Sequence, residues 1–243
     1  MNTSKITPQL NNISTRKSAI IVGISLLAMA IAAIFSFGIV LVPIIKNEDA
    51  ITTVDAIKSS ALLFRLGILG WLLILVLDVI VAWALYHFFK RVNKNIAILT
   101  TWFRVIYTVF LATGILCLVL ALLLATYPNY LEGFSTTLLN TLVEFFLNAF
   151  ITIWTIGLIV FGLHLAGLSY LAIKHHAIHN TFSIFLAIAA FSYIVLSIAK
   201  IVLPAYQSQI ATAESILSAP MAISEIGFAV WLLIKGGKVE TNQ

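Results

Sequence analysis

The sequence predicts an all-α integral membrane protein, a polytopic bundle of six transmembrane helices. Hydrophobic residues make up 61% of its 243 residues and charged residues only 9%, whereas about a quarter of the residues in soluble domains are charged. The apolar residues form six segments that are each long enough to cross a bilayer as a helix. These segments are Ser18 to Ile45, Ala61 to Phe89, Ile96 to Ala125, Leu142 to Ile173, Thr181 to Leu203 and Leu217 to Ile234.

The first segment begins after Lys17, and the Ala-Met-Ala at residues 28–30 resembles the cleavage site of a signal peptide. A signal peptide has an apolar stretch of about 7–15 residues, but the apolar run here continues to Ile45. We therefore expect an uncleaved first helix. No long polar or low-complexity stretch separates the segments, so residues 1–243 are expected to form a single transmembrane domain.

Basic residues predict the orientation of the bundle, because loops rich in Lys and Arg stay in the cytoplasm. One side has Lys5, Arg16, Lys17, Lys90, Arg91, Lys94, Lys174, Lys235 and Lys238, and the opposite loops have only Lys46 and Lys58. Both termini are therefore expected to be cytoplasmic. The net charge of +5 is spread over short loops without interleaved aromatic residues, so we expect the lipid bilayer as partner and no nucleic acid.

Four titratable residues, Asp78, Arg104, His164 and Glu225, lie near the middle of their segments. Each is ten to twelve residues from a lysine at the segment end, which at 1.5 Å per residue is about 15 Å inside the bilayer. A charged group there costs about 2.5–3.5 kcal/mol. These residues are therefore expected to form a polar centre or a ligand-binding site.

The second and third segments supply the first pair of this centre. Trp71 shares a helical face with Asp78, whereas Arg65 is displaced by more than a quarter-turn. Because Arg104 has the same predicted depth as Asp78, we expect the two to form an ion pair. The face of the third segment that bears Arg104 also has Thr100, Thr101, Tyr107 and Thr108. The only cysteine, Cys117, follows in an apolar run and is interpreted as a packing residue.

The fourth segment is predicted to be central. A small or polar stripe along it is expected to face protein or water over its whole length. The stripe consists of Thr141, Glu144, Asn148, Thr155, Gly162 and Ser169. His164 lies on nearly the opposite face, so this helix is expected to have partners on two sides.

The last two segments also have polar and small residues aligned on one face. The fifth aligns Tyr193, Ser197 and Lys200, and the sixth aligns Ser218, Ala222, Glu225 and Ala229 behind a kink expected at Pro220. Near the outer boundary, Arg65, Glu144 and Lys200 are expected to form a second charged layer. Alternatively, the two cations extend to the lipid headgroups.

Metal ligands have two candidate places, and we expect neither to bind a metal. The first consists of Asp78, His164 and Glu225, and the second of His175, His176 and His179. Neither has the HExxH spacing of a zinc site, and no second histidine lies at the depth of His164. The chain also has no nucleophile elbow, phosphate loop or dinucleotide fingerprint. We therefore expect no cofactor and no enzymatic activity.

Three stretches of the sequence form a specific combination. They read LDVIVAWALYHFFKRVNKNIAILTTWFRV, FGLHLAGLSYLAIK and APMAISEIGFAVWLLIKG, and they include Asp78, Arg104, Gly162 to Leu165, Glu225 and Trp231 to Gly236. In them the chain resembles the bacterial membrane family called domain of unknown function 4386. The resemblance implies a multi-pass protein of the bacterial cell membrane and supplies no reaction.

Two classes of function follow from the polar centre. In the first, the protein has a structural or regulatory role and its charges only fix helix packing, which predicts a dry and fully paired centre. In the second, it is a transporter or receptor for a small molecule or ion, which predicts a water-accessible cavity reaching the midplane. A metal-dependent intramembrane enzyme is a distant third alternative.

Overall fold

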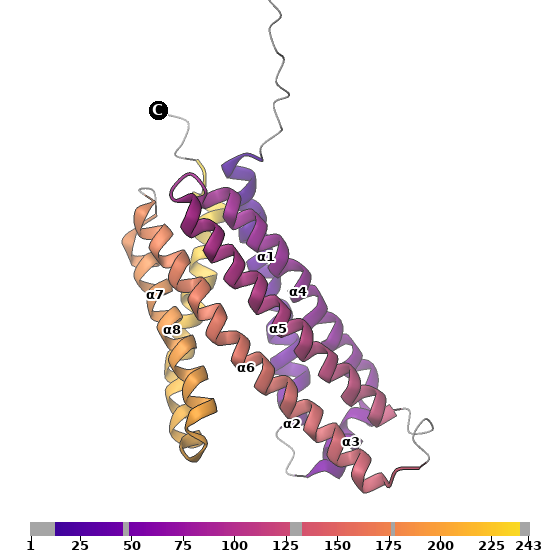
Figure 1. The fold of residues 1–243 in the computed structure, drawn as a ribbon. Helices are drawn as coiled ribbons and strands as arrows, with labels where there is room; N and C mark the ends of the chain where they lie inside the picture. The colour runs from indigo at the N-terminus through magenta and orange to yellow at the C-terminus, as the bar shows by residue number, and fades with distance from the viewer. Residues whose placement is uncertain (1–12, 46–48, 127–132, 176–177, 239–243) are drawn as a thin grey trace, which may run out of the picture.

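A computed structural model describes residues 13–45, 49–126, 133–175 and 178–238 of the chain (Figure 1). Throughout this part of the chain the regular structure is helical, and six helical segments are long and apolar enough to cross a membrane. They are Thr15–Ile45, Ala61–Phe89, Lys94–Thr126, Thr136–Lys174, Asn180–Val202 and Pro204–Ile234. The predicted fold class is therefore confirmed.

The first span combines three helices: α1 (Thr15–Ala33), the π-helix η1 (Ile34–Leu41) and α2 (Val42–Ile45). A short helix, α3 (Ala50–Ser59), follows it. The other spans are α4 (Ala61–Phe89), α5 (Lys94–Thr126), α6 (Thr136–Lys174), α7 (Asn180–Val202) and α8 (Gln207–Ile234), with the 3₁₀-helix η3 (Pro204–Tyr206) before α8.

The structure differs from the sequence prediction at four elements. Helix α6 begins at Thr136, six residues before the predicted Leu142. Helix α8 begins at Gln207, ten residues before the predicted Leu217, because the helix continues beyond the apolar part of the segment. Pro220 lies within α8 without ending it. The π-helix η1 and helix α3 are not predicted from the apolar pattern.

Helix α3 lies outside the spans and begins with a capping residue. The Asp49 carboxylate accepts hydrogen bonds from the backbone N–H and the hydroxyl of Thr52, both at 2.7 Å. The bond from the Thr52 backbone holds the pKa of Asp49 below its ordinary value. Asp49 therefore caps α3, which packs on α5 and α6.

The six spans form a closed ring. Each long helix from α4 to α8 packs on the next one along the chain, and α1 packs on both α4 and α8. We call the end where α1 begins and α8 ends the basic end, because Arg16, Lys90, Lys174 and Lys235 lie there, and the other end the distal end. Towards the distal end the α7–α8 pair diverges from the remaining helices (Figure 1).

The hydrophobic core reflects this divergence. A cluster at the basic end includes Phe88 of α4, Leu171 of α6, Leu186 of α7 and Phe228 of α8. A second cluster lies towards the distal end and, within the described part of the chain, takes its residues only from α1 to α6. It includes Cys117, which is buried as a packing residue. The α7–α8 pair is therefore held to the bundle mainly at the basic end.

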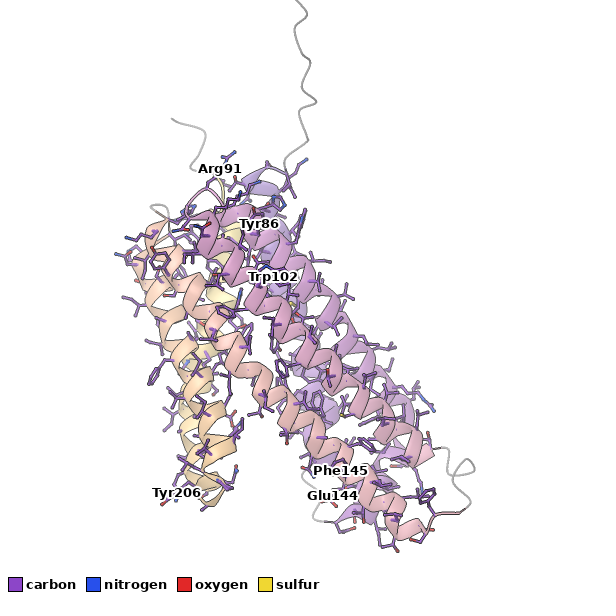
Figure 2. All side chains as sticks on the ribbon, in the orientation of Figure 1. Tyr86, Arg91, Trp102, Glu144, Phe145 and Tyr206 are labelled. Atoms are coloured by element: carbon purple, nitrogen blue, oxygen red, sulfur yellow. The ribbon has the colours of Figure 1, made fainter. Side chains whose placement is uncertain are left out.

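The polar stripe of α6 is buried in one part and exposed in the other. Thr155, Gly162 and Ser169 are buried, and the Ser169 hydroxyl donates a hydrogen bond to the Ser183 carbonyl of α7 at 2.8 Å. In contrast, Thr141, Glu144 and Asn148 are exposed. The stripe is therefore covered by protein only from Thr155 towards the basic end, because α7 leaves α6 in the distal half (Figure 2).

Arg16 closes the ring at the basic end. Its Nη1 donates hydrogen bonds to the carbonyls of Leu232 at 3.1 Å and Gly236 at 2.9 Å, and its Nη2 donates to the carbonyl of Leu233 at 2.6 Å. The last carbonyls of a helix lack partners within the helix and favour a nearby cation. Arg16 of α1 thus ties the start of the first span to the end of the last one.

We predict that Arg16→Ala destabilises the folded protein by about 1.5–3 kcal/mol, because three carbonyls lose a charged donor. Thermal unfolding of purified protein in a mild detergent measures the change. Lys17→Ala is the matched control, because it removes the adjacent, exposed cation. Equal stability of the two variants would contradict the role given to Arg16.

We also predict that Gly162→Ala destabilises the contact between α6 and α7. A Cβ at Gly162 would lie 2.9 Å from the backbone oxygen of Ala190 and 2.5 Å from a side-chain carbon of Ile194, and such overpacking costs about 1–3 kcal/mol. Gly38→Ala is the control, because its Cβ would meet nothing within 4 Å. The same unfolding measurement should separate the two, and no difference would argue against a tight contact.

Candidate functional site

The centre of the bundle contains a buried ion pair. Asp78 of α4 and Arg104 of α5 lie with Oδ1 and Nη2 2.6 Å apart, and their side chains are 0% and 3% exposed. The ion pair expected from their equal depth is thus present. Asp78 Oδ2 and Arg104 Nε have no hydrogen-bond partner among the described residues.

His164 of α6 holds the other side of Arg104. Arg104 Nη1 lies 3.1 Å from His164 Nε2, and His164 Nδ1 lies 2.8 Å from the Thr100 carbonyl oxygen. A guanidinium can only donate, so Nε2 must accept and the proton of the neutral ring must be on Nδ1, which donates to Thr100. This chain of bonds connects α4, α5 and α6.

The same bonds exclude His164 as a metal ligand in this arrangement, because both ring nitrogens have protein partners. Within the described ranges, no three His, Cys, Asp or Glu residues are placed to hold a metal ion. The weak candidate set of Asp78, His164 and Glu225 is therefore not assembled by the fold.

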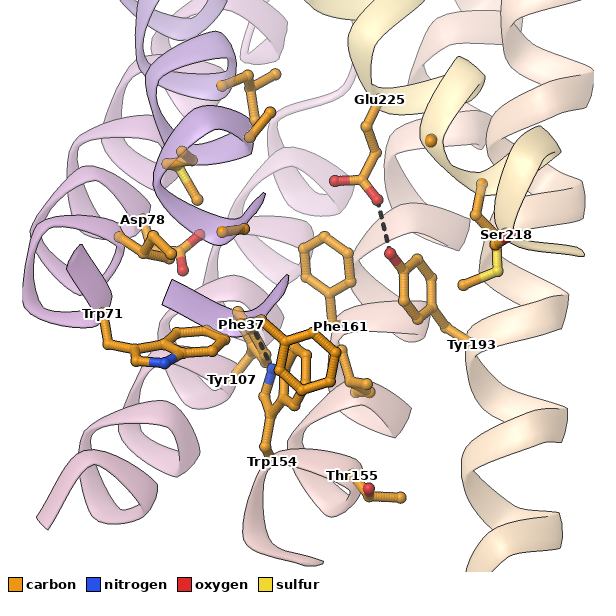
Figure 3. Close-up of a pocket in the computed structure, with 18 of the residues that line it drawn as sticks. Phe37, Trp71, Asp78, Tyr107, Trp154, Thr155, Phe161, Tyr193, Ser218 and Glu225 are labelled. Atoms are coloured by element: carbon orange, nitrogen blue, oxygen red, sulfur yellow. Dashed lines mark hydrogen bonds between the residues drawn. The ribbon is translucent and has the colours of Figure 1, made fainter. Parts of the chain in front are cut away.

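Glu225 lies apart from the other three residues of the predicted centre. It is on α8, and its Oε1 accepts a hydrogen bond from the Tyr193 hydroxyl of α7 at 2.9 Å. Figure 3 shows the Glu225 and Asp78 carboxylates on opposite sides of one pocket. The fold therefore brings Asp78, Arg104 and His164 into direct contact and places Glu225 across a space, because α8 diverges from α4 and α5.

That space is a cavity of about 460 Å³ lined by side chains from all six spans. Asp78, Arg104 and Glu225 contribute to the lining, whereas His164 lies behind Arg104. The lining also includes the Lys200 and Glu214 side chains, from the distal halves of α7 and α8. The cavity thus extends from the distal part of the α7–α8 pair to the ion pair in the middle of the bundle.

Aromatic side chains form much of the wall, namely Phe37, Trp71, Tyr107, Trp154, Phe161 and Tyr193 (Figure 3). They contact one another edge to face or tilted, with ring centroids 4.9 Å apart for Tyr107 and Phe161 and 5.2 Å apart for both Trp71–Trp154 and Phe161–Tyr193. The Trp71 Nε1 has no hydrogen-bond partner among the described residues.

Three residues of this wall were not predicted from the sequence, namely Phe37, Trp154 and Phe161. Phe37 is part of the π-helix η1 and packs against Trp71 and Trp154 at centroid distances of 6.5 and 5.1 Å. The wider turn of a π-helix changes which side chains face inward. No composition signal marks η1, but Phe161 follows Trp154 by seven residues and precedes His164 by three, and this helical spacing was a usable signal.

The predicted outer layer of Arg65, Glu144 and Lys200 is replaced by another pair. Lys200 Nζ lies 2.6 Å from Glu214 Oε1 of α8. Glu144 is exposed on α6, and Figure 2 places it on a different arm of the bundle from Tyr206, which lies near the distal end of α7. Arg65 is exposed on α4. The divergence of α7 from α6 thus separates Lys200 from Glu144.

The histidines at the basic end have packing and capping roles. The His175 ring stacks on Phe88 with centroids 5.4 Å apart and also meets the edge of Trp231. His179 caps α7, because its Nδ1 accepts a hydrogen bond from the Thr181 backbone at 3.3 Å. His176 lies outside the described residues.

Comparison with known proteins places the chain in a family. An uncharacterised protein from Archaeoglobus fulgidus is 30% identical to it over 173 residues, which covers 71% of this chain and 85% of that protein. No solved structure gives a significant match. A family model with the description "Domain of unknown function (DUF4386)" matches residues 21–236. This match covers most of the chain and all six spans in whole or in part, so the protein belongs to the family with that description.

Proposed function

We propose that this protein binds a small molecule in its central cavity and acts in the membrane as a carrier or receptor for it. The observation that carries the proposal is the cavity itself, which reaches the buried Asp78–Arg104 pair in the middle of the spans. A centre that only fixes helix packing needs no such space. Its volume of about 460 Å³ lies in the range of small-molecule sites, roughly 300–1,000 Å³.

Polar atoms without partners support the proposal. Asp78 Oδ2, Arg104 Nε and Trp71 Nε1 are buried without hydrogen-bond partners among the described residues, and all three side chains line the cavity. Leaving such an atom unpaired costs about 1–3 kcal/mol. A small shift of these side chains would bring the unpaired atoms into contact with water or a bound ligand in the cavity.

A structural role for part of the centre is the second candidate. The chain of bonds from Asp78 through Arg104 and His164 to the Thr100 carbonyl favours it, because these bonds connect α4, α5 and α6. Such a network can specify packing without any chemistry. In our proposal it fixes one wall of the cavity, while the α7–α8 pair forms the other.

We also propose the bacterial cell membrane as the location, with the basic end in the cytoplasm. Arg16, Lys90, Lys174 and Lys235 at that end support this orientation. The cavity would then extend from the middle of the bundle towards the outer face.

We predict that the cavity contains water. In a Cys117→Ala background, Ala222→Cys should react with a charged, membrane-impermeant thiol reagent at least about tenfold faster than Ile223→Cys, because the reactive thiolate forms in water and not in lipid. Ala222 lines the cavity, while its neighbour Ile223 is 55% exposed on another face of α8. The two positions have nearly the same depth, so only the face of the helix differs. Equal rates, or no reaction at Ala222→Cys, would overturn the proposed function.

We predict strong coupling between Asp78 and Arg104. Asp78→Asn should cost about 3–5 kcal/mol of stability, because it leaves a buried cation unpaired, and adding Arg104→Gln should restore part of this loss. Unfolding of the two single variants and the double variant measures the coupling. Neutralising the more exposed pair with Lys200→Gln and Glu214→Gln is the control, with an expected coupling below about 1 kcal/mol. Additive effects at Asp78 and Arg104 would contradict the prediction.

A further inference from the structure

We infer that the ligand of this cavity is an organic cation, such as a substituted ammonium, whose charge is held by Glu225 and whose apolar body lies among the aromatic side chains. This inference rests on the proposed function and names its ligand class.

The charged side chains of the cavity lining are not all paired. Three carboxylates, Asp78, Glu214 and Glu225, and two cations, Arg104 and Lys200, line the cavity. Asp78 is paired with Arg104 and Glu214 with Lys200, in both cases at 2.6 Å. In the part of the chain that the structure describes, Glu225 has no cation within ion-pair distance. One carboxylate in the wall is therefore left without a partner of opposite charge.

The Glu225 carboxylate is directed into the cavity. Its Oε1 accepts a hydrogen bond from Tyr193, and Figure 3 shows the other carboxylate oxygen directed towards the interior of the pocket. A carboxylate at this depth gains most from a cation that brings its own charge into the low-dielectric space. A ligand with a positive charge thus completes the site.

Aromatic side chains form the cavity wall near Glu225. Phe161 lies next to Tyr193, with centroids 5.2 Å apart and planes perpendicular at 87°. Tyr107, Trp154, Trp71 and Phe37 continue the wall towards the ion pair. Aromatic faces attract cations, and they attract alkylated ammonium groups without the oxygen ligands that a small metal ion needs. The lining therefore favours an organic cation over an inorganic one.

An anion is disfavoured by the bonding of Arg104. Asp78 neutralises its charge, Nη1 is directed at His164, and the guanidinium carbon lies 5.5 Å from the centre of the Phe161 ring. Only Nε lacks a partner among the described residues. A ligand anion would have to displace Asp78, which would leave that carboxylate buried and unpaired.

Three water-soluble probes of similar shape and different charge test the inference. They are benzyltrimethylammonium, the net-neutral N,N-dimethylbenzylamine N-oxide, and the anion phenylmethanesulfonate. Binding to the purified full chain in a neutral detergent is measured by calorimetric titration. We expect the cation to bind at least about tenfold more tightly than either of the others, a difference of about 1.4 kcal/mol.

The variant Glu225→Gln should lose this preference and bind the cation about tenfold more weakly. Glu144→Gln is the matched control, because it removes an exposed carboxylate of α6 that is not part of the cavity lining, and its cation affinity should change less than about threefold. The comparison of probes on the unmodified chain decides the inference even if Glu225→Gln does not fold.

The outcomes separate this inference from the proposed function. Equal binding of all three probes, or preference for the anion, would overturn the organic cation and leave the small-molecule cavity supported. Binding of none of them, with Ala222→Cys reactive towards the thiol reagent, would also overturn the organic cation. If Ala222→Cys is unreactive as well, the proposed function fails with it.

Discussion

The need to neutralise a guanidinium inside the hydrocarbon region governs the centre of this bundle. Arg104 meets that need with Asp78 on one side and the unprotonated nitrogen of His164 on the other. Each partner comes from a different helix, so neutralising one charge also fixes the positions of α4, α5 and α6. The His164 ring is held in turn by the Thr100 carbonyl, which leaves its tautomer no freedom. These bonds thereby hold together the helices α4, α5 and α6 that form one wall of the cavity.

The α7–α8 pair is attached to the other helices in a different way. It contacts the bundle in the basic half, through the apolar cluster that includes Leu186 and Phe228, through Gly162 against the Ala190 carbonyl, and through Arg16 at the end of α8. Towards the distal end it has its own ion pair, Lys200 with Glu214, and leaves α6. Because Lys200 and Glu214 neutralise each other within the α7–α8 pair, neither needs a partner of opposite charge on the other helices. The difference between the two attachments produces the cavity.

Hydropathy predicted all six spans and the fold class, because each span must hide its backbone from lipid and so needs a long apolar run. Equal depth predicted the contact of Asp78 with Arg104. Depth alone did not predict which side of the cavity Glu225 lies on, because this depends on the angle between α8 and the other helices. The partner of Lys200 was missed because Glu214 precedes Leu217, where the predicted sixth segment begins. Phe37 was missed because the extra residues of a π-helix turn have no counterpart in the apolar pattern. The roles of these residues in binding stay predictions.

The bonds of Arg16 to the carbonyls of Leu232, Leu233 and Gly236 join positions that are more than 210 residues apart in the sequence. During synthesis the first helix enters the membrane long before its partner exists, and it stays there with an open flank while the following spans are inserted. The ring closes only when the last helix arrives. Because Glu225 is on that helix, the final assembly step also installs the last charged residue of the cavity wall. A chain that stops before α8 therefore lacks both the closure of the ring and the carboxylate that we propose as the ligand's partner.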